Sequence, residues 1–485
     1  MPKRKLVSLS VPSELRPMSN DDVGESISIE TQIVDPISTS SNATTGAGVT
    51  TFKLPHSGIL QRDLRYQFTV SSNPAPVTGL NAFSMCVGAM GCISRIVMKT
   101  SNGQILHDID QSNFLSMIQQ NFVSTEVQNN LDRAEMGNVN PYEYVSASVA
   151  VADGGGQLRV ADTEYRNSTV NGYSNQRSGF KTRVDDGSTW CVQLSKLLPV
   201  LSAETSYFPL FIMKEDIIIE IHKASKDDWL ISGSAVDAVR QAPIALPASV
   251  QLTNEQLVMN TIHYPAQSLA QIQQRALNRS FPYIDYTLVR RSFGAVADGQ
   301  SLGEQTIRVG LQGRTLRNMY AVKSHPTDKN VWNGAFYSCH NPAQTWNFKI
   351  NDMRLFNNNV DNPCREHDLL EETRDDAPQI PLQLYSNTAQ QNVSVACFND
   401  MGIGNKSDLA GRMNILGVDM RIVPDENSYD GNGIKVGTAP TEFSLNYNSV
   451  TAQDADSNKT TDLKLFYCYA RSYSIDGQGS LITSY

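Results

Sequence analysis

A turn flanked by two apolar runs and followed by a helical segment occurs twice in this chain, and this repeat constrains the fold most. In the first copy, RIVMKTSNGQILHDIDQSNFLSMIQQ, the turn is Asn102-Gly103. Both residues tolerate the positive φ angles of a type I′ turn, so the pair predicts a tight β-hairpin. In the second copy, about 250 residues further on, Asn351-Asp352 stands in the same place. Because repeats set the architecture of a chain, we expect two similar domains in tandem.

A segment with helical character follows each turn. After the first turn, Asp110 or Ser112 can cap a helix, and Phe114 and Leu115 then fall on one of its faces. After the second turn, the acidic run DLLEE predicts another helix. The distance from turn to helix is about 12 residues in the first copy and about 18 in the second. Chance similarity between two hairpin–helix units remains the alternative to duplication.

The rest of the chain carries many short strand signals and few helical ones. Charged residues make up only 18% of the chain, which suits strands joined by polar loops better than long solvated helices. A length of 485 residues also exceeds one ordinary core. We therefore predict an all-β protein, two tandem jelly-roll β-sandwiches with a few short helices in the connections. The expected parts are an N-terminal arm at residues 1–25, a first jelly roll at 26–280 and a second at 281–485.

The expected strands are apolar or alternating runs bounded by turn residues. The stretch YFPLFIMKEDIIIEIH carries the densest strand signal. A helix is expected at residues 265–277, next to a domain boundary between residues 275 and 285. A strand pair is expected at residues 249–260. Single strands are expected at residues 26–34, 51–54, 64–70, 190–201, 207–222, 286–291, 305–311, 316–322, 392–398, 413–423, 463–469 and 473–481.

A small basic cluster, Lys3, Arg4 and Lys5, opens the chain. The net charge of the whole chain is −9, so the bulk of the surface does not attract nucleic acid or anionic membrane. Two interpretations of the cluster stay open. It is either part of a solvated, disordered terminus or an arm that contacts phosphate, lipid or a neighbouring subunit.

The cysteines and the first residues indicate the compartment. Seven scattered cysteines predict buried thiols in a reducing environment rather than a disulfide framework. The beginning of the chain lacks the apolar core of a signal peptide, and no run of about 18 apolar residues occurs. We expect a soluble chain that is made in the cytosol or nucleus.

No group of residues predicts catalysis. Cys339 and His340, with Cys364 and His367, form the only metal-like set, but adjacent strand residues point to opposite faces, so we do not expect zinc. The loop DADSN at residues 454–458 begins like a calcium loop but lacks the glycine and glutamate that an EF-hand needs. Adjacent acids in polar loops suit solvated surface better than a glycosidase pair. Nucleophile-elbow, P-loop and dinucleotide motifs are missing. We expect no enzyme activity, metal or cofactor.

Three segments carry a resemblance to a known family. The first is the strand–turn–strand–helix pattern at residues 93–115, matched at 348–370; the second is the Pro-containing stretch at 207–221. The third is the ending, FYCYARSYSIDGQGSLI at residues 466–482, which is similar to the family's closing strand pair, with Ser474 where Asn is usual. On these segments the chain resembles the double jelly-roll major capsid proteins of the lineage of adenoviruses, large DNA viruses, virophages and polinton-like viruses. Its length resembles the smaller virophage and polinton-like members.

The resemblance implies a structural role in a virion. A homotrimer would form a pseudo-hexagonal capsomer, and capsomers would tile the icosahedral shell of a double-stranded DNA virus after synthesis in the host cytoplasm or nucleus. Implied partners are neighbouring capsomers, penton proteins and minor capsid or cement proteins. The arm with Lys3, Arg4 and Lys5 would face inward, toward the genome or an inner membrane.

Long polar loops would project outward and contact neighbouring chains or the host surface. Residue-level subunit interfaces are not implied, because loops are where such families differ. The candidate loops are residues 138–187, 223–247, 387–408 and 425–461.

Two rival interpretations come from other classes of protein. A β-sandwich that binds or cleaves glycans would need a groove lined with exposed tryptophans and acids. The candidates Trp190, Trp229, Trp332 and Trp346 are few and scattered in the sequence. A viral vertex or spike protein built on similar rolls is the other rival, but two fused copies favour the main shell component.

Overall fold

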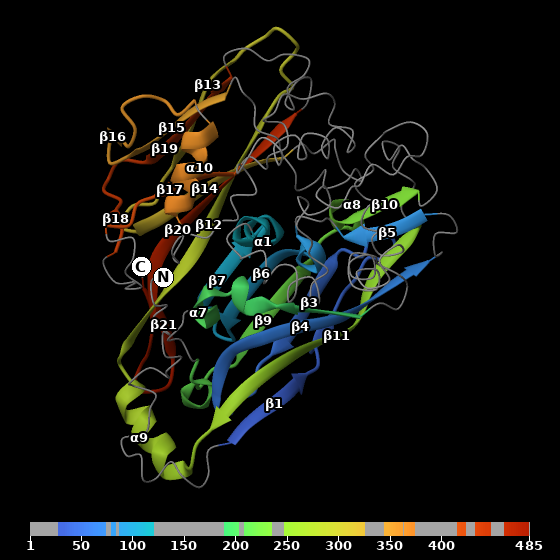
Figure 1. The fold of residues 1–485 in the computed structure, drawn as a ribbon. Coiled ribbons are helices and arrows are strands. Elements are labelled where there is room, and N and C mark those ends of the chain that lie inside the picture. The colour runs from blue at the N-terminus through green and yellow to red at the C-terminus, as the bar shows by residue number, and fades with distance from the viewer. Residues whose placement is uncertain are drawn as a thin grey trace, which may run out of the picture.

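The computed structural model describes residues 28–73, 79–83, 87–120, 189–202, 208–234, 247–324, 344–361, 363–373, 415–422, 432–447 and 460–484. Within these residues, antiparallel β-strands dominate. They form two β-sandwiches, one after the other along the chain, which Figure 1 shows in blue to green and in yellow to red.

The first sandwich, here the first roll, packs a four-stranded sheet against a five-stranded sheet. The first sheet has the order β1 (Ser28–Val34), β11 (Ser249–His263), β4 (Ile59–Asn73), β8 (Thr189–Gln193). The second has the order β2 (Ser38–Thr39), β3 (Gly48–Lys53), β9 (Ile217–Lys223), β6 (Ile93–Thr100), β7 (Ile105–Asp110). A separate pair consists of β10 (Leu230–Ser234) and β5 (Gly79–Phe83).

The second sandwich, the second roll, also has two sheets. One has the order β12 (Ser280–Phe293), β20 (Thr461–Ile475), β14 (Thr315–Ser324), β17 (Ile415–Asp419), with β18 (Ile434–Lys435) paired to β14 and β21 (Leu481–Ser484) paired to β20. The other has the order β13 (Leu302–Val309), β19 (Thr441–Tyr447), β15 (Gln344–Ile350), β16 (Met353–Arg354).

The two rolls have the same topology. If the eight principal strands of each roll are numbered in chain order, one sheet runs 1-8-3-6 and the other runs 2-7-4-5 in both rolls. This interleaving of early and late strands is that of a jelly roll. The predicted all-β fold of two tandem jelly rolls is therefore confirmed. The repeated hairpin occupies the fourth and fifth strands in each roll, β6–β7 and β15–β16.

The two repeated turns have different conformations. Of the first pair, only Gly103 has a positive φ, 93°, and its N–H donates to the carbonyl of Thr100 at 3.0 Å. With the register shift that β6–β7 shows beside it, this is a longer hairpin loop with a bulge, so the type I′ prediction is wrong there. In the second pair, Asn351 and Asp352 both have positive φ, 51° and 63°, as a type I′ turn requires.

Helices follow the hairpins, as predicted. They are α1 (Ser112–Gln120) and α10 (Pro363–Glu372). The predicted caps of α1 are wrong, because Ser112 donates to the Ile93 carbonyl and Asp110 accepts from the Gln111 N–H, before the helix begins. The predicted helix between the rolls is α9 (Ala266–Ala276). Among the described residues, no helix is long and apolar enough to cross a membrane.

Several predicted strands differ from the observed elements. Only the start of residues 190–201 is a strand, and helical turns follow at η5 (Leu194–Lys196) and α7 (Pro199–Ser202). The expected strand at residues 207–222 likewise contains a helical turn, η6 (Leu210–Ile212), before the strand β9 begins. These segments are buried, so their apolar runs reflect burial rather than strand geometry. The predicted pair at 249–260 is the single strand β11, and residues 463–475 lie in the single strand β20. Other short helices are η3 (Gly88–Cys92) and α8 (Lys226–Trp229).

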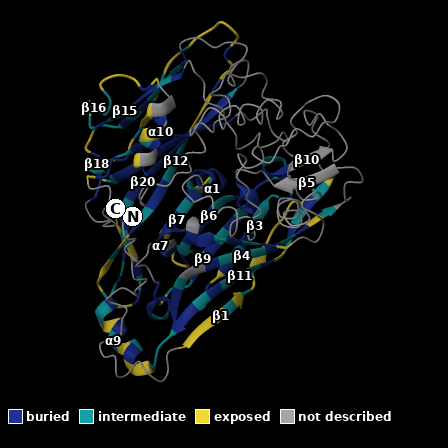
Figure 2. Cartoon of the chain, in the orientation of Figure 1, coloured by how far each residue is buried: buried dark blue, intermediate teal, exposed yellow. Residues whose placement is uncertain are grey.

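The strand β20 contributes to two hydrophobic cores. Leu465, Tyr467 and Tyr469 lie in the core of the second roll, whereas Phe466 and Cys468 lie in the core of the first. Successive side chains of a strand point to opposite faces, so the sheet that contains β20 has one roll on each side. Figure 2 shows the resulting buried band along β20. The first roll therefore packs directly against the outer face of this sheet, which separates the two cores.

Candidate functional site: the junction between the two rolls

The strand β7 lies at the edge of its sheet and contacts β12 of the second roll. An edge strand presents backbone groups that need partners. Arg471 of β20 donates through Nη1 to the Leu106 carbonyl at 2.8 Å and through Nη2 to the Ile105 carbonyl at 2.7 Å. The hydroxyl of Tyr283 also donates to the Leu106 carbonyl, at 3.0 Å. Side chains of the second roll therefore satisfy the edge of the first.

His107 of β7 is fully buried at this junction. The Val200 N–H donates to its Nε2 at 3.1 Å, so Nε2 is unprotonated and the proton lies on Nδ1. Nδ1 then donates to the Asp285 carboxylate at 2.9 Å. This chain of hydrogen bonds links α7 and β7 of the first roll to β12 of the second.

The Asp285 carboxylate collects the contacts of the junction. Its second oxygen accepts from Arg471 Nη1 at 2.8 Å and from the Tyr469 hydroxyl at 3.1 Å. Burial by itself raises the pKa of the Asp285 carboxyl, but His107 and Arg471 outweigh burial and lower this pKa. Burial and the nearby carboxylate raise the pKa of Tyr469. The carboxylate is thus ionised, paired and hydrogen-bonded, the condition in which a buried charge is tolerated.

A second buried polar group lies between β20 and α1. The Lys464 ammonium lies 4.0 Å from the centre of the Phe114 ring, in a cation–π geometry. It donates to Asp462 at 2.9 Å and to the Ser324 hydroxyl at 2.5 Å. Burial lowers the pKa of Lys464 to about 8, although Asp462 opposes this shift. The aromatic ring belongs to the first roll and the ion pair to the second, so this group also bridges the rolls.

A third buried group joins the two sheets inside the first roll. Asn254 has a positive φ of 49° and interrupts the register of β11. The next residue, Glu255, is buried and accepts from Lys223 at 2.7 Å, from Thr50 at 2.6 Å and from Tyr66 at 2.5 Å. The bulge therefore turns a carboxylate into the sandwich, where three donors from other strands bind it.

Sequence reasoning did not predict this junction. Asp285 and Arg471 are 186 residues apart, and a single sequence carries no sign that they meet. One signal was present, because Lys464 and Arg471 interrupt the apolar run of the closing strand. A strand with cores on both faces has no solvent side for a charge, so each charge in it needs a buried partner.

The tryptophans do not form a glycan-binding platform. Trp190, Trp229 and Trp346 are all buried, with at most 6% of each residue exposed. Trp332 lies outside the described residues. The rival glycan interpretation needs exposed aromatic rings, so the three described tryptophans do not support it.

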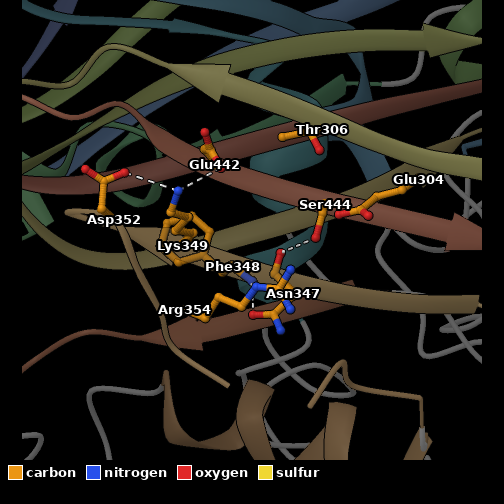
Figure 3. Close-up of a pocket in the computed structure, with 9 residues that line it drawn as sticks. All are labelled: Glu304, Thr306, Asn347, Phe348, Lys349, Asp352, Arg354, Glu442 and Ser444. Atoms are coloured by element: carbon orange, nitrogen blue, oxygen red, sulfur yellow. Dashed lines mark hydrogen bonds and ion pairs between the residues drawn. The ribbon is translucent and has the colours of Figure 1, made fainter. Parts of the chain in front are cut away.

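A shallow polar pocket of about 210 Å³ lies on the outer face of the sheet that contains β13, β19, β15 and β16. Figure 3 shows the Lys349 ammonium between two carboxylates, Asp352 at 3.1 Å and Glu442 at 3.4 Å. Arg308 donates to the other oxygen of Glu442 at 2.8 Å. Both oxygens of Glu442 are therefore engaged by cations, which suits a solvated sheet face rather than acid–base catalysis.

Most of the sequence-predicted site residues fall outside the described part of the chain. These are Lys3, Arg4 and Lys5, the loops at 138–187 and 387–408, and parts of those at 223–247 and 425–461. In the described parts of the last two ranges the loop prediction is wrong, because they contain α8 and β10, and β18 and β19. Cys339, His340 and the loop at 454–458 also lie outside it. Among the described residues, no group of three or more His, Cys, Asp or Glu side chains could hold a metal ion. Cys92 is a buried thiol, and burial raises its pKa.

No protein-family model and no curated protein matches the chain. Solved capsid structures do share its fold. VP54 of PBCV-1, fitted into a reconstruction of the virophage Sputnik, has a TM-score of 0.57 at 10% identity over 95% of this chain and 97% of that chain. A chain of the Sputnik virophage structure has a TM-score of 0.52 at 12% identity, covering 100% and 92% of the two chains. The Faustovirus major capsid protein has a TM-score of 0.50 at 9% identity, covering 92% and 90%. The chain therefore has the double jelly-roll fold of these capsid proteins over almost its full length.

Proposed function

We propose that this chain is the major capsid protein of a double-stranded DNA virus, a structural protein of the virion without catalytic activity. The observation that carries the proposal is the capsid fold, which extends over nearly the whole chain and nearly the whole of the matched capsid proteins. The two rolls have one topology and share a buried junction. One chain therefore supplies two similar, firmly joined units.

Three such chains assemble into a homotrimer in this proposal. Three pairs of similar rolls give six lobes, so the capsomer has a pseudo-hexagonal outline that tiles an icosahedral shell. Closed cyclic symmetry is the usual form of a homo-oligomer. The partners are neighbouring capsomers, penton proteins and minor capsid or cement proteins.

The parts of the chain have separate roles in this proposal. Residues 1–25 form an arm whose Lys3, Arg4 and Lys5 face the genome or an inner membrane. The first roll covers residues 26–280 and the second 281–485, a division at the beginning of β12. The long loops lie on the outside, between capsomers or toward the host. The parts of residues 223–247 and 425–461 that form α8, β10, β18 and β19 belong to the rolls and are not among these loops.

Light scattering on the purified full-length chain tests the proposal. A capsomer has three times the mass of one 53.5 kDa chain, and this mass should persist on dilution to micromolar concentration. A stable monomer at micromolar concentration would argue strongly against a capsid role. Binding of that monomer to a glycan array would then support the rival interpretation.

A further inference from the structure

The first strand of the first roll presents apolar side chains to solvent. Among the described strands, β1 pairs only with β11 and forms the edge of its sheet. Ile29 and Ile33 are 66% and 63% exposed, and Ile37, just beyond the strand, is 61% exposed. Ile29, Thr31 and Ile33 share the outer face of the strand because side chains alternate. An exposed apolar edge strand is a template for another strand and normally has a cover.

The segment directly before β1 has the composition of such a cover. Residues 1–27 lie outside the described part of the chain. In KLVSLSVP, Val7, Leu9 and Val11 alternate strictly with serines, which is the signature of a strand with one apolar face. Pro12 ends this pattern, since proline cannot continue a hydrogen-bonded ladder.

We propose that residues 6–11 add to the free edge of β1 in the same chain, as an antiparallel strand. In the register that places Leu9 opposite Thr31, Val7 and Val11 face Ile33 and Ile29 on the outer surface. The fourth apolar residue of the segment, Leu6, then lies opposite Val34 on the inner face, where Val34 packs against the core. Lys5 then lies opposite Asp35, so that unlike charges meet at the end of the pair. This register therefore satisfies both the apolar pattern and the charge pattern.

The length of the connection indicates that the segment paired with β1 comes from the same chain and not from a neighbouring copy. Sixteen residues, 12–27, separate the segment from β1, which is enough for a reversal. They are rich in Pro, Ser, Asn and Asp, which suit turns. A tethered segment acts at an effective concentration in the millimolar range, whereas a segment from another copy must first associate. The inference does not depend on the proposed capsid role, so either can fail alone.

Disulfide trapping in the full-length chain tests the pairing and its source. The variant Leu9→Cys with Thr31→Cys should form a disulfide between residues 9 and 31 within one chain, identified by peptide mass after mild oxidation. The matched control, Ser10→Cys with Thr31→Cys, places the first thiol on the opposite face and should form several-fold less. Isotopically labelled and unlabelled chains, mixed before refolding, distinguish the sources. A link found only between chains overturns the assignment to the same chain.

Hydrogen exchange provides a test that does not depend on introduced cysteines. Removal of residues 1–11 should leave the roll folded but expose the outer edge of β1. The outward amides of β1 should then exchange at least tenfold faster than in the full-length chain, while those of β4 keep their rates. Equal exchange of β1 in both proteins would overturn the proposal.

Discussion

The eighth principal strands of the two rolls, β11 and β20, have the same place in the topology but different surroundings. In β11 buried and partly exposed residues alternate, as expected for a sheet with one face on a core. In β20, residues 461–469 are all buried, because the first roll covers the outer face of this sheet. A hydrophobic pattern therefore reports how many layers cover a strand, and it does not report the position of the strand in a fold.

Removal of the buried Asp285 carboxylate at the junction should have the largest effect on the packing of the two rolls. Asp285→Ala leaves Arg471 buried without its carboxylate, and His107 loses its acceptor. Loss of one partner of a buried ion pair costs about 3–5 kcal/mol, so we expect a loss of this size in the free energy of unfolding, measured in urea. Asp352→Asn, which removes the charge of an exposed partner of Lys349 and keeps a residue that tolerates the φ of 63° at this turn, is the control and should cost less than about 1 kcal/mol. Equal effects of the two changes would contradict a stabilising role for the junction.

Two adjacent residues of β20 test whether one strand serves two cores. Phe466→Ala and Leu465→Ala should each cost about 2–5 kcal/mol, because each leaves a cavity. Their local effects should separate, with faster amide exchange in α1, which packs on that face of β20, for Phe466→Ala, and in β15 and β19 for Leu465→Ala. The same exchange pattern for both variants would show that the cores are not distinct.

The lowered pKa of Lys464 predicts that the free energy of unfolding depends on pH. This pKa is about 8 in the folded chain, below the value of about 10.4 in an unfolded chain. Between these values the unfolded chain holds more protons, so the contribution of Lys464 to the free energy of unfolding rises with pH, by at most about 1.4 kcal/mol per pH unit. Relative to Lys464→Met, the natural chain should therefore gain stability from pH 8 to 9.5 in urea titrations. A constant difference would contradict the lowered pKa.

The two hairpin turns give the smallest expected effects. Gly103→Ala should destabilise the first roll by about 1–2 kcal/mol, because alanine is disfavoured at a φ of 93°. Asp352→Gly should change stability by no more than about 0.5 kcal/mol, since glycine suits a type I′ turn and the pair with Lys349 is exposed. Thermal unfolding of both variants checks this order, and the reverse order would contradict the assigned turn types.

The sequence allowed the fold class, the repeat and most strands to be predicted, because alternation and turn residues are local signals. The type of the first turn was not predictable, because Asn102-Gly103 fits both a two-residue turn and a longer loop with a bulge. The helical turns at residues 194–202 were predicted to be a strand, because a short buried segment is apolar whether it is helical or extended. The junction of His107, Asp285 and Arg471 depends on contacts between residues far apart in the chain, which no local pattern encodes.

An electron cryo-microscopy map of the assembled protein shows directly whether the chain forms capsomers. We expect particles in which three chains contribute six similar β-sandwiches in a pseudo-hexagonal ring, with β20 between the two cores of each chain. A map with isolated two-roll chains, or with a symmetry that does not place six rolls in one ring, would contradict the capsid assignment.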